Sequence, residues 1–542
     1  MKIALAQLNY HIGNFEANES KIIANLKKAK AENVDLIVFA ELAICGYPPR
    51  DFLIVEDFIQ ICIASVERIA KECVGLAAII RAPSLNPDVK GKRLHNTAYF
   101  LNDGKIISTH HKQLLPTYDV FDENRYFESG STFKCIDFKG EKIALTICED
   151  LWNIEGQSLY KKSPMDLLIQ EKPDVMINIA ASPFSIHQTE NRTKVLKWNT
   201  DQYQLPIFYV NHVGAQTELI FDGGSCVMNK EGEKIAQLPL FEEYFSIFDT
   251  TQLKHETIAS IPSKFEKIEA ALVLGIKDYF KKLNFKTATL GLSGGIDSAL
   301  TLALVVKALG KDNVLPILMP SQFSSDHSIS DSLALCQNLG CDHHIIEIEK
   351  LYESFDQQLA PLFEGTDFGI AEENIQSRIR GTLLMAHTNK FGSILLNTSN
   401  KSELAVGYGT LYGDMAGGLS VIGDVYKTEV FELCRFINRN KEIIPDNIIT
   451  KPPSAELRPD QKDSDSLPDY EVLDAILFEY IENSLSPADI IEKGFDEATV
   501  KRILRMVNMN EYKRHQTPPI LRISSKAFGM GRRMPIVGKY LS

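Results

Sequence analysis

The stretch Ser293-Gly294-Gly295-Ile296-Asp297-Ser298 decides how the second half of this chain folds. It follows the apolar run 287–292 and opens the helix-periodic run 298–309, so it predicts a turn from a strand into a helix. Two glycines let the backbone approach a phosphate, and a helix N-terminus adds free N–H groups and partial positive charge. A lone Gly-Gly would favour an ordinary turn, whereas the full pattern favours a phosphate loop. It is neither a Walker A loop nor a dinucleotide fingerprint.

Strands and helices alternate around this loop. The strand 287–292 precedes the helix 298–309, which Gly310 closes. The strand 314–319 and the helix 326–339, closed by Gly340, lead to a strand at 343–348. This β-α-β-α-β order predicts a parallel, Rossmann-like sheet.

The first half of the chain shows a different pattern, with several strands and few long helices. Residues 16–33 have helical spacing, and 35–42 is a nearly continuous apolar run that predicts a buried strand. Asn102-Asp103-Gly104 between two β-like runs predicts a hairpin. This pattern favours an α+β sandwich over a doubly wound sheet. The predicted strands are 2–8, 35–42, 96–101, 105–110, 142–148, 175–181, 206–212 and 224–229.

A boundary between two domains is expected where periodicity is lost. The segment 250–264 lacks a clear period and contains Pro262. We therefore predict one domain at 1–250, a linker at 251–270 and a second domain at 271–542. The region 452–468 is rich in Pro, Asp and Ser and predicts a loop or lid.

Composition limits the classes of function. The 542 residues are 44% hydrophobic and carry a formal net charge of -13, which argues against binding to nucleic acid. No run approaches the roughly 18 apolar residues of a membrane span, and the start has no signal-peptide pattern. Nine irregularly spaced cysteines suggest a reducing compartment. We expect a cytoplasmic protein with no membrane partner and no structural metal site.

Three residues near predicted strand ends form a second candidate site: Glu41, Lys112 and Cys148. Each alone has a simpler interpretation, since a buried cysteine is usually a small hydrophobe and the other two are usually solvated. Together they supply a thiol nucleophile, a general base and a cation for the oxyanion, which amide hydrolysis requires. The charge of Lys112 is also expected to lower the pKa of Cys148 below about 8.5.

Both halves resemble known enzyme families. The order Glu41, Lys112, Cys148 at strand ends resembles the nitrilase (carbon–nitrogen hydrolase) family over about the first 250 residues. The loop 293–298 resembles the pyrophosphate loop of the ATP pyrophosphatases, which adenylate a substrate oxygen. The resemblance implies an α/β protein with an N-terminal nitrilase-like α-β-β-α sandwich and a C-terminal Rossmann-like parallel sheet.

This order of modules resembles the glutamine-dependent NAD⁺ synthetase family. Two departures are Ala40, where the family usually has proline, and Arg50, where an acidic residue is common. The resemblance implies amidation of nicotinic acid adenine dinucleotide with ammonia from glutamine, using ATP and Mg²⁺, by a homo-oligomer. The segments that carry it are 46–49, 115–123, 125–127, 374–381, 400–403, 412–418, 423–428, 452–458 and 514–519.

The resemblance also implies roles for individual residues. Asp297 and Glu403 would hold Mg²⁺, and the ATP-binding set would be Ser293, Gly294, Gly295, Ile296, Asp297, Ser298 and Thr398. The dinucleotide would contact Asn374, Arg378, Arg380 and Lys427. Glutamine would contact Tyr118, Glu123, Ser182 and Arg192, and Glu123 would also support Lys112.

Three alternatives remain open from the sequence. The same modules would serve an enzyme with another acceptor, such as a nucleobase or tRNA, although the acidic charge argues against tRNA. A second is an ammonia-dependent synthetase whose hydrolase half is inactive. The third is a non-enzymatic scaffold built from both folds.

Overall fold

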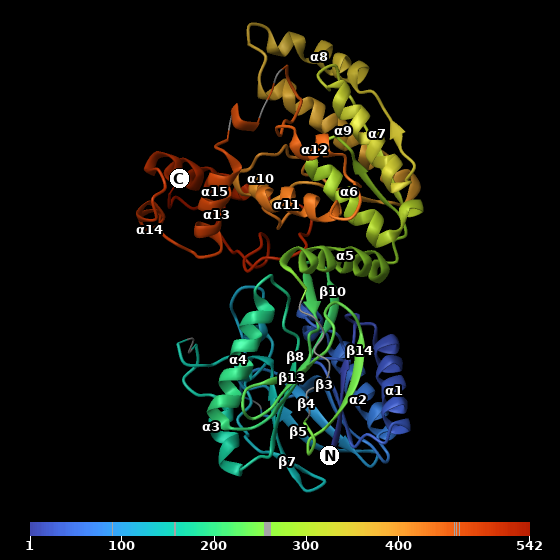
Figure 1. Cartoon of the computed structure of the whole chain (residues 1–542), viewed down its shortest axis with the longest axis vertical. Helices are drawn as coiled ribbons and strands as arrows, with labels where there is room; N and C mark the ends of the chain where they lie inside the picture. Colours follow the sequence, from blue (N-terminus) through green and yellow to red (C-terminus); the bar gives the residue numbers. More distant parts are fainter. Residues whose placement is uncertain are drawn as a thin grey trace. The chain divides into compact units, whose positions relative to one another are not determined.

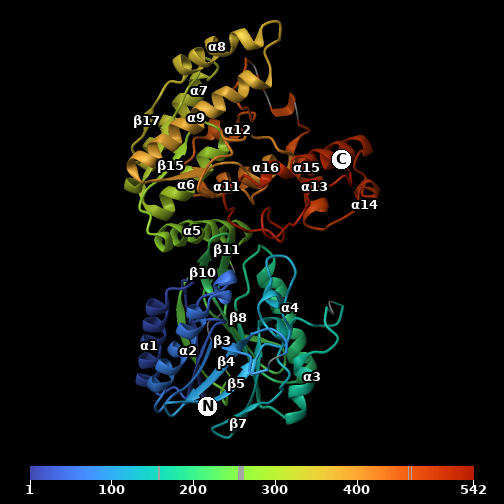
Figure 2. The same cartoon turned by 180° about the vertical axis from the view of Figure 1, so that it is seen from behind.

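The computed structural model describes residues 1–88, 90–156, 159–253, 262–459, 461, 463–465 and 467–541. The chain divides into two compact units, Met1–Ile261 and Pro262–Ser542. Figure 1 and Figure 2 show their elements from opposite sides.

The first unit contains two six-stranded sheets. One has the order β14-β1-β2-β3-β4-β5 and the other the order β13-β12-β9-β8-β7-β6. In the first sheet the strands are β1 (Lys2–Gln7), β2 (Leu36–Phe39), β3 (Ala77–Leu85), β4 (Leu94–Asn102), β5 (Lys105–His111) and β14 (Tyr244–Asp249). In the second they are β6 (Ile136–Phe138), β7 (Glu141–Ile147), β8 (Val175–Ala180), β9 (Ile207–Asn211), β12 (Cys226–Met228) and β13 (Lys234–Gln237).

Helices cover the outer faces of these sheets. The helix α2 packs on β3, β4 and β5 with α1 beside it, and α3 and α4 pack on β7 and β12 of the other sheet. The sheets contact each other through β1, β2 and β9, whose side chains are buried except for that of Lys2. The helices are α1 (Phe15–Ala31), α2 (Glu56–Glu72), α3 (Pro164–Leu168) and α4 (Gln188–Tyr203), with short 3-10 turns η1 (Arg50–Ile54), η2 (Glu123–Arg125), η3 (Cys148–Leu151) and η4 (Ile169–Glu171).

The predicted sandwich is confirmed, including its hairpin. The strands β4 and β5 pair antiparallel on either side of Asn102-Asp103-Gly104. Asp103 and Gly104 have φ of 48° and 76°, as a tight hairpin turn requires. A second hairpin, which the sequence did not suggest, joins β10 (Val213–Gln216) to β11 (Leu219–Asp222).

The second unit contains a five-stranded sheet in the order β17-β16-β15-β18-β19, with every pair parallel. This confirms the predicted Rossmann-like arrangement. The strands are β15 (Ala288–Gly291), β16 (Val314–Leu318), β17 (His344–Ile345), β18 (Ile394–Asn397) and β19 (Leu419–Ser420). The helix α6 packs on β15 and β16, and α9 packs on β15 and β18.

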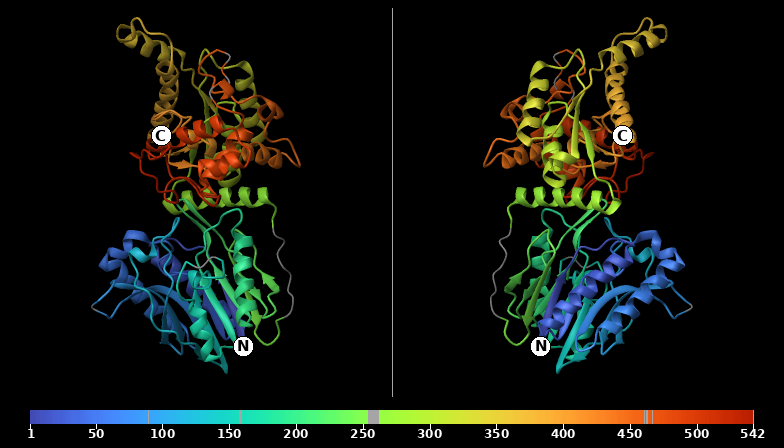
Figure 3. Two further views of the ribbon diagram at one scale, coloured as in Figure 1. Left: turned by 90° about the vertical axis from the view of Figure 1, so that its left-hand side faces the viewer. Right: turned by 90° about the vertical axis from the view of Figure 1, so that its right-hand side faces the viewer.

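Twelve helices are described in this unit. In the two side views of Figure 3, α8 (gold) extends away from the sheet of its unit. The helices are α5 (Lys264–Leu283), α6 (Ile296–Leu309), α7 (Asp326–Leu339), α8 (Glu349–Phe363), α9 (Ile370–Phe391), α10 (Lys401–Val406), α11 (Lys427–Ile437), α12 (Asp446–Thr450), α13 (Tyr470–Ile481), α14 (Pro487–Glu492), α15 (Glu497–Met509) and α16 (Glu511–Arg514), with 3-10 turns η5 (Lys311–Asn313) and η6 (Asp463–Asp465).

Several boundaries differ from the sequence predictions. The helix α6 begins at Ile296 rather than residue 298, and β17 spans two residues of the predicted 343–348. The predicted linker 251–270 overlaps α5, because Ser263 and Glu266 form a capping box that starts this helix at Lys264. Residues 254–261 of that linker lie outside the described part. No described helix combines the length and apolar character that crossing a bilayer requires.

Candidate functional site

The structure brings Glu41, Lys112 and Cys148 together inside the first unit. They follow β2, β5 and β7, and all three are buried. Lys112 Nζ donates to Glu41 Oε1 at 2.9 Å and to Glu123 Oε1 at 2.7 Å. Tyr47 donates its hydroxyl to the same oxygen of Glu123 at 2.8 Å. Lys112 therefore links two buried carboxylates beside the cysteine.

A strained turn presents Cys148. This residue begins η3 directly after β7 and has φ of 44°, which is rare for a residue with a side chain. The carboxylate of Asp150 accepts hydrogen bonds from the backbone N–H groups of Gln113 (3.1 Å), Leu114 (2.9 Å) and Ile147 (3.0 Å). Asp150 thus joins the Cys148 turn to the segment that carries Lys112. Such strain commonly persists at catalytic positions.

The ionisation of this cluster differs in part from the prediction. Burial favours the neutral carboxyl of Glu41, but Arg81 and Lys112 together lower its pKa to about 2. Burial and Glu41 raise the pKa of Cys148 well above its usual value, and Lys112 opposes them only in part. Lys112 therefore lowers the pKa of Cys148 as expected, but burial and Glu41 outweigh this contribution. The pair is thus a neutral thiol and an ionised carboxylate, so Glu41 is in the protonation state that can accept a proton.

Two polar side chains of this cluster were not predicted. Arg81 is fully buried, and its Nη1 lies 2.9 Å from Glu41 Oε1. Asn96 donates to Glu41 Oε1 at 3.0 Å and approaches Glu123 Oε2 at 3.4 Å. An arginine inside the apolar run 77–82 signals a buried anion, but the sequence does not say which one.

Beside Cys148, a second acidic group faces two tyrosines. Tyr118, which is 40% exposed, donates its hydroxyl to both carboxylate oxygens of Glu149 at 3.0 Å, and Tyr160 donates at 3.1 Å. Burial raises the pKa of Glu149 to about 7, and Lys112 and the tyrosines oppose this rise. Glu149 was not predicted, although it directly follows Cys148 in the sequence.

Ser182 and Arg192 take different positions. Ser182 is buried after β8, with its N–H donating to Asn211 and its hydroxyl accepting from Gln188. Arg192 forms a buried ion pair with Asp222 at 2.8 Å and donates to the backbone carbonyl of Gly223. The Arg192 side chain is thus bonded within the core, and its contact with glutamine stays a prediction. Asn211 contacts both Asp222 and Ser182, so Arg192 supports Ser182 indirectly.

In the second unit, the loop 293–298 forms the predicted strand-to-helix turn. Gly294 has φ of +81°, and a Cβ added there would lie 2.4 Å from the backbone oxygen of Ser328. Ser293 Oγ accepts the N–H of Gly295 at 3.2 Å, and Ser298 Oγ donates to the carbonyl of Gly295 at 3.0 Å. These bonds hold a compact loop in which only glycine fits at position 294.

Asp297, Glu403 and Lys427 meet at the start of α6. Lys427 forms ion pairs with both carboxylates, and Asn400 donates to Asp297 Oδ1 at 2.9 Å. Burial and the charge of Asp297 raise the pKa of Glu403 to about 8, while Lys427 opposes this. Among the described residues, no group of three or more His, Cys, Asp or Glu forms a metal site. Mg²⁺ often takes one or two carboxylates plus phosphate oxygens, so this donor pair fits it only alongside a phosphate ligand.

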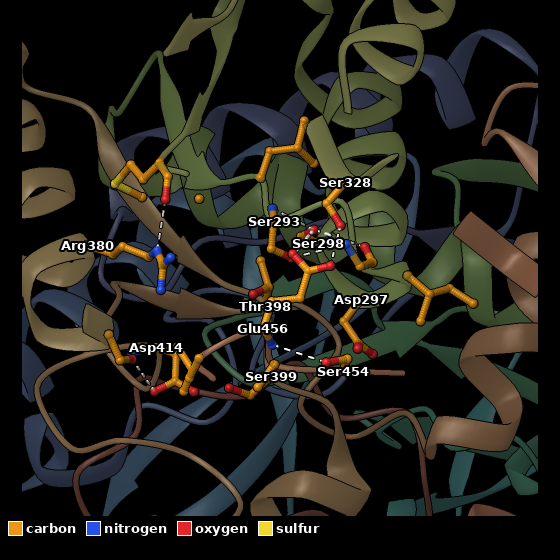
Figure 4. A pocket seen from close by; sticks show the side chains of 18 of the residues that line it. Ser293, Asp297, Ser298, Ser328, Arg380, Thr398, Ser399, Asp414, Ser454 and Glu456 are labelled. Carbon is orange, nitrogen blue, oxygen red and sulfur yellow. Dashed lines mark hydrogen bonds between the residues drawn. The ribbon is translucent and has the colours of Figure 1, made fainter. Parts of the chain in front are cut away.

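A cavity of about 300 Å³ adjoins the loop. Figure 4 shows Ser293, Asp297 and Ser298 on one side and Arg380 on the other. Thr398 lines it too. Arg380 Nε donates to the Met319 carbonyl, and burial lowers the pKa of the guanidinium to about 10. A cation on one side and a phosphate loop on the other suit an elongated anion.

Two residues of the predicted dinucleotide set do not line this cavity. Asn374 accepts a hydrogen bond from Thr410 at 2.6 Å, and the exposed Arg378 donates to the Leu411 carbonyl at 3.2 Å. Both side chains therefore contact the 410–411 loop.

The segment 452–458 contributes a carboxylate that the sequence did not single out. Glu456 accepts hydrogen bonds from Ser325 Oγ at 2.9 Å and Ser328 Oγ at 2.7 Å, at the start of α7. Lys451 also donates to Ser328 Oγ at 3.1 Å. The predicted loop thus forms a wall of the cavity.

Known proteins match both units. The carbon-nitrogen hydrolase model matches residues 2–257, and the NAD synthase model matches residues 268–517. The glutamine-dependent NAD(+) synthetase of Synechocystis sp. is 48% identical, over 98% of this chain and 98% of the relative. The enzyme of the same name from Thermotoga maritima is 39% identical, over 100% of this chain and 99% of its own. A solved glutamine-dependent NAD+ synthetase from Acinetobacter baumannii, in complex with adenosine diphosphate, is 40% identical, covers 99% of both chains and has a TM-score of 0.79.

Proposed function

This chain belongs to the glutamine-dependent NAD(+) synthetase family, and we propose that it amidates nicotinic acid adenine dinucleotide to NAD⁺ with ammonia from glutamine. One observation carries the proposal. The cysteine–glutamate–lysine cluster and the phosphate loop are both complete, each in its own unit. The acceptor itself comes from the family.

In the first unit, Cys148 attacks the side-chain amide of glutamine. Glu41 takes the thiol proton, and Lys112 stabilises the tetrahedral oxyanion. Glu41 gives this proton to the leaving nitrogen, which releases ammonia and leaves a thioester on Cys148. Glu41 and Glu123, both bonded to Lys112, would then activate the water that releases glutamate.

Glutamine itself needs partners for its charged end. Glu149 suits the α-ammonium group, because it is a buried carboxylate beside Cys148. Tyr118 donates its hydroxyl to this carboxylate, and Ser182 lies directly after β8. We assign the glutamine contacts to these three side chains, with Arg192 as their support.

In the second unit, the carboxylate of the dinucleotide attacks the α-phosphate of ATP and displaces pyrophosphate. A carboxylate is a poor electrophile, and adenylation gives it a good leaving group, which ammonia then displaces as AMP. The loop 293–298 and Thr398 would bind ATP, and Mg²⁺ held by Asp297 and Glu403 would neutralise phosphate charge. Lys427, which pairs with both acids, would move to the phosphates or the adenylate.

Of the two arginines in the predicted dinucleotide set, Arg380 lines the cavity, so we assign it to the dinucleotide. Asn374 and Arg378 would have to break their hydrogen bonds with the 410–411 loop before they could contact the dinucleotide.

Ammonia in bulk water is mostly protonated near neutral pH, so we expect its passage between the sites to exclude water. We also expect a cytoplasmic homo-oligomer, and the nine cysteines, all free, suit a reducing compartment.

The test compares acceptors. With ATP, Mg²⁺ and glutamine present, AMP release should require nicotinic acid adenine dinucleotide and should not respond to a nucleobase or tRNA. AMP release with either of those, and none with the dinucleotide, would assign the same modules to another acceptor.

A further inference from the structure

Arg81 lies in the interior of β3 (Ala77–Leu85). Its strand pairs it with Ala98 of β4, and its side chain is fully buried. Nη1 is 2.9 Å from Glu41 Oε1, yet none of the three guanidinium nitrogens makes a hydrogen bond of good geometry. Burying an arginine is costly unless a charge compensates it. The contact with Glu41 is therefore electrostatic.

The two carboxylate oxygens of Glu41 have different surroundings. Oε1 faces Arg81, Lys112 and Asn96 at 2.9, 2.9 and 3.0 Å. Oε2 accepts the backbone N–H of Ala181 at 3.1 Å. Two hydrogen-bond donors, Lys112 and Asn96, and the charge of Arg81 hold Oε1, which leaves the remaining acceptor capacity of the carboxylate on Oε2.

We propose that Arg81 is a positioning residue for glutamine hydrolysis, which holds Glu41 as an oriented carboxylate so that it can accept the proton of Cys148. This inference rests on the proposed glutaminase reaction. Arg81 does not touch the reacting atoms on this account, and it acts through Glu41.

The charges around Glu41 support this role. The facing groups are Arg81 from β3, Lys112 after β5, Glu123 of η2, Cys148 of η3, Tyr47 after β2, and His212 after β9, whose Nε2 lies 2.6 Å from the Glu41 carbonyl. Arg81 and Lys112 are the two cations of this cluster, and Glu149 adds a third carboxylate, beside Cys148. Without Arg81 the cluster would lose one of its two positive charges, which disfavours both ionised Glu41 and the thiolate of Cys148.

The experiment uses the full chain with Arg81→Met, which keeps a long side chain and removes the charge. Glutaminase kcat is measured against pH at saturating glutamine, so that the profile reports groups in the enzyme–substrate complex. We expect the acid limb to move up by about 1–3 pH units, the usual effect of one neighbouring charge. Arg81→Lys should restore most of the shift, and ammonium-dependent NAD⁺ synthesis should stay unchanged.

A second measurement does not depend on glutamine turnover. Alkylation of Cys148 by iodoacetamide is followed against pH, with Cys148→Ala as background. Because the positive charge is lost, alkylation of Cys148 in Arg81→Met should require a higher pH than in the wild type. Arg81→Gln should behave in the same way, and it serves as the test variant if Arg81→Met fails to fold. Unchanged alkylation in a folded neutral variant would overturn the proposal, even if the wild type proved not to hydrolyse glutamine. Equal loss of glutamine- and ammonium-dependent synthesis would also overturn it, since that marks a general structural role.

Discussion

Lys112 donates to Glu123 at 2.7 Å, in the buried centre of the first unit. The lysine therefore serves two carboxylates, since Glu41 accepts from it as well. Burial raises the pKa of Glu123, which Lys112 opposes. Removing this second carboxylate should leave the nucleophile and the first base in place and disturb Lys112.

Glu123→Gln should lower glutaminase kcat by about 100-fold, at the low end of the effect of a general acid or base. Ammonium-dependent NAD⁺ synthesis should not change, because the second unit is untouched. Steady-state rates with each nitrogen donor check this. A variant that uses glutamine as well as the wild type does would remove Glu123 from the reaction.

Cys148→Ala should abolish the use of glutamine and retain activity with ammonium, because only the nucleophile is lost. Cys135→Ala is the matched control, since Cys135 is half-buried before β6. It should keep both activities. If Cys148→Ala still used glutamine, another group would have to be the nucleophile.

Glutamine binding should depend on pH through Glu149. Its pKa is raised to about 7, so it is largely protonated below that pH in the free enzyme. A protonated carboxyl binds an ammonium group poorly, so kcat/KM for glutamine should rise as pH increases through about 7. Glu149→Gln should lower kcat/KM and remove this limb. A limb that persists in the variant would assign the titration to a different group.

Gly294→Ala should destroy ATP-dependent synthesis with either nitrogen donor. The new Cβ would lie 2.4 Å from the Ser328 oxygen, and the φ of +81° adds roughly 1–2 kcal/mol of strain. Gly365→Ala is the control, because it has φ of +79° with no atom within 4 Å of an added Cβ. Comparison of ATP binding by calorimetry separates the two. Similar ATP affinity in both variants would mean that the loop does not hold the phosphates.

The sequence predicted most reliably what short local patterns determine. The loop 293–298 and the hairpin around Gly104 depend on neighbouring residues, and both are present. The roles of Arg81 and Arg192 depend on partners far along the chain, Glu41 and Asp222. Arg81 was missed for that reason, and the sequence did not indicate the ion pair of Arg192 with Asp222.

Burial also changed the expected chemistry. From the sequence alone, Lys112 was expected to lower the pKa of Cys148. Lys112 does lower it, but desolvation and Glu41 outweigh the lysine and raise the pKa overall. The sequence shows which charged residues are present, but it does not show how far each of them is removed from water.

The coupling of both units to one product is tested most directly by one assay. The chain is incubated with ATP, Mg²⁺, glutamine and nicotinic acid adenine dinucleotide, and NAD⁺ is followed by alcohol dehydrogenase, with each component omitted in turn. We predict NAD⁺ only when all four are present, and ammonium should replace glutamine. Absence of NAD⁺ with both glutamine and ammonium would contradict the proposed function.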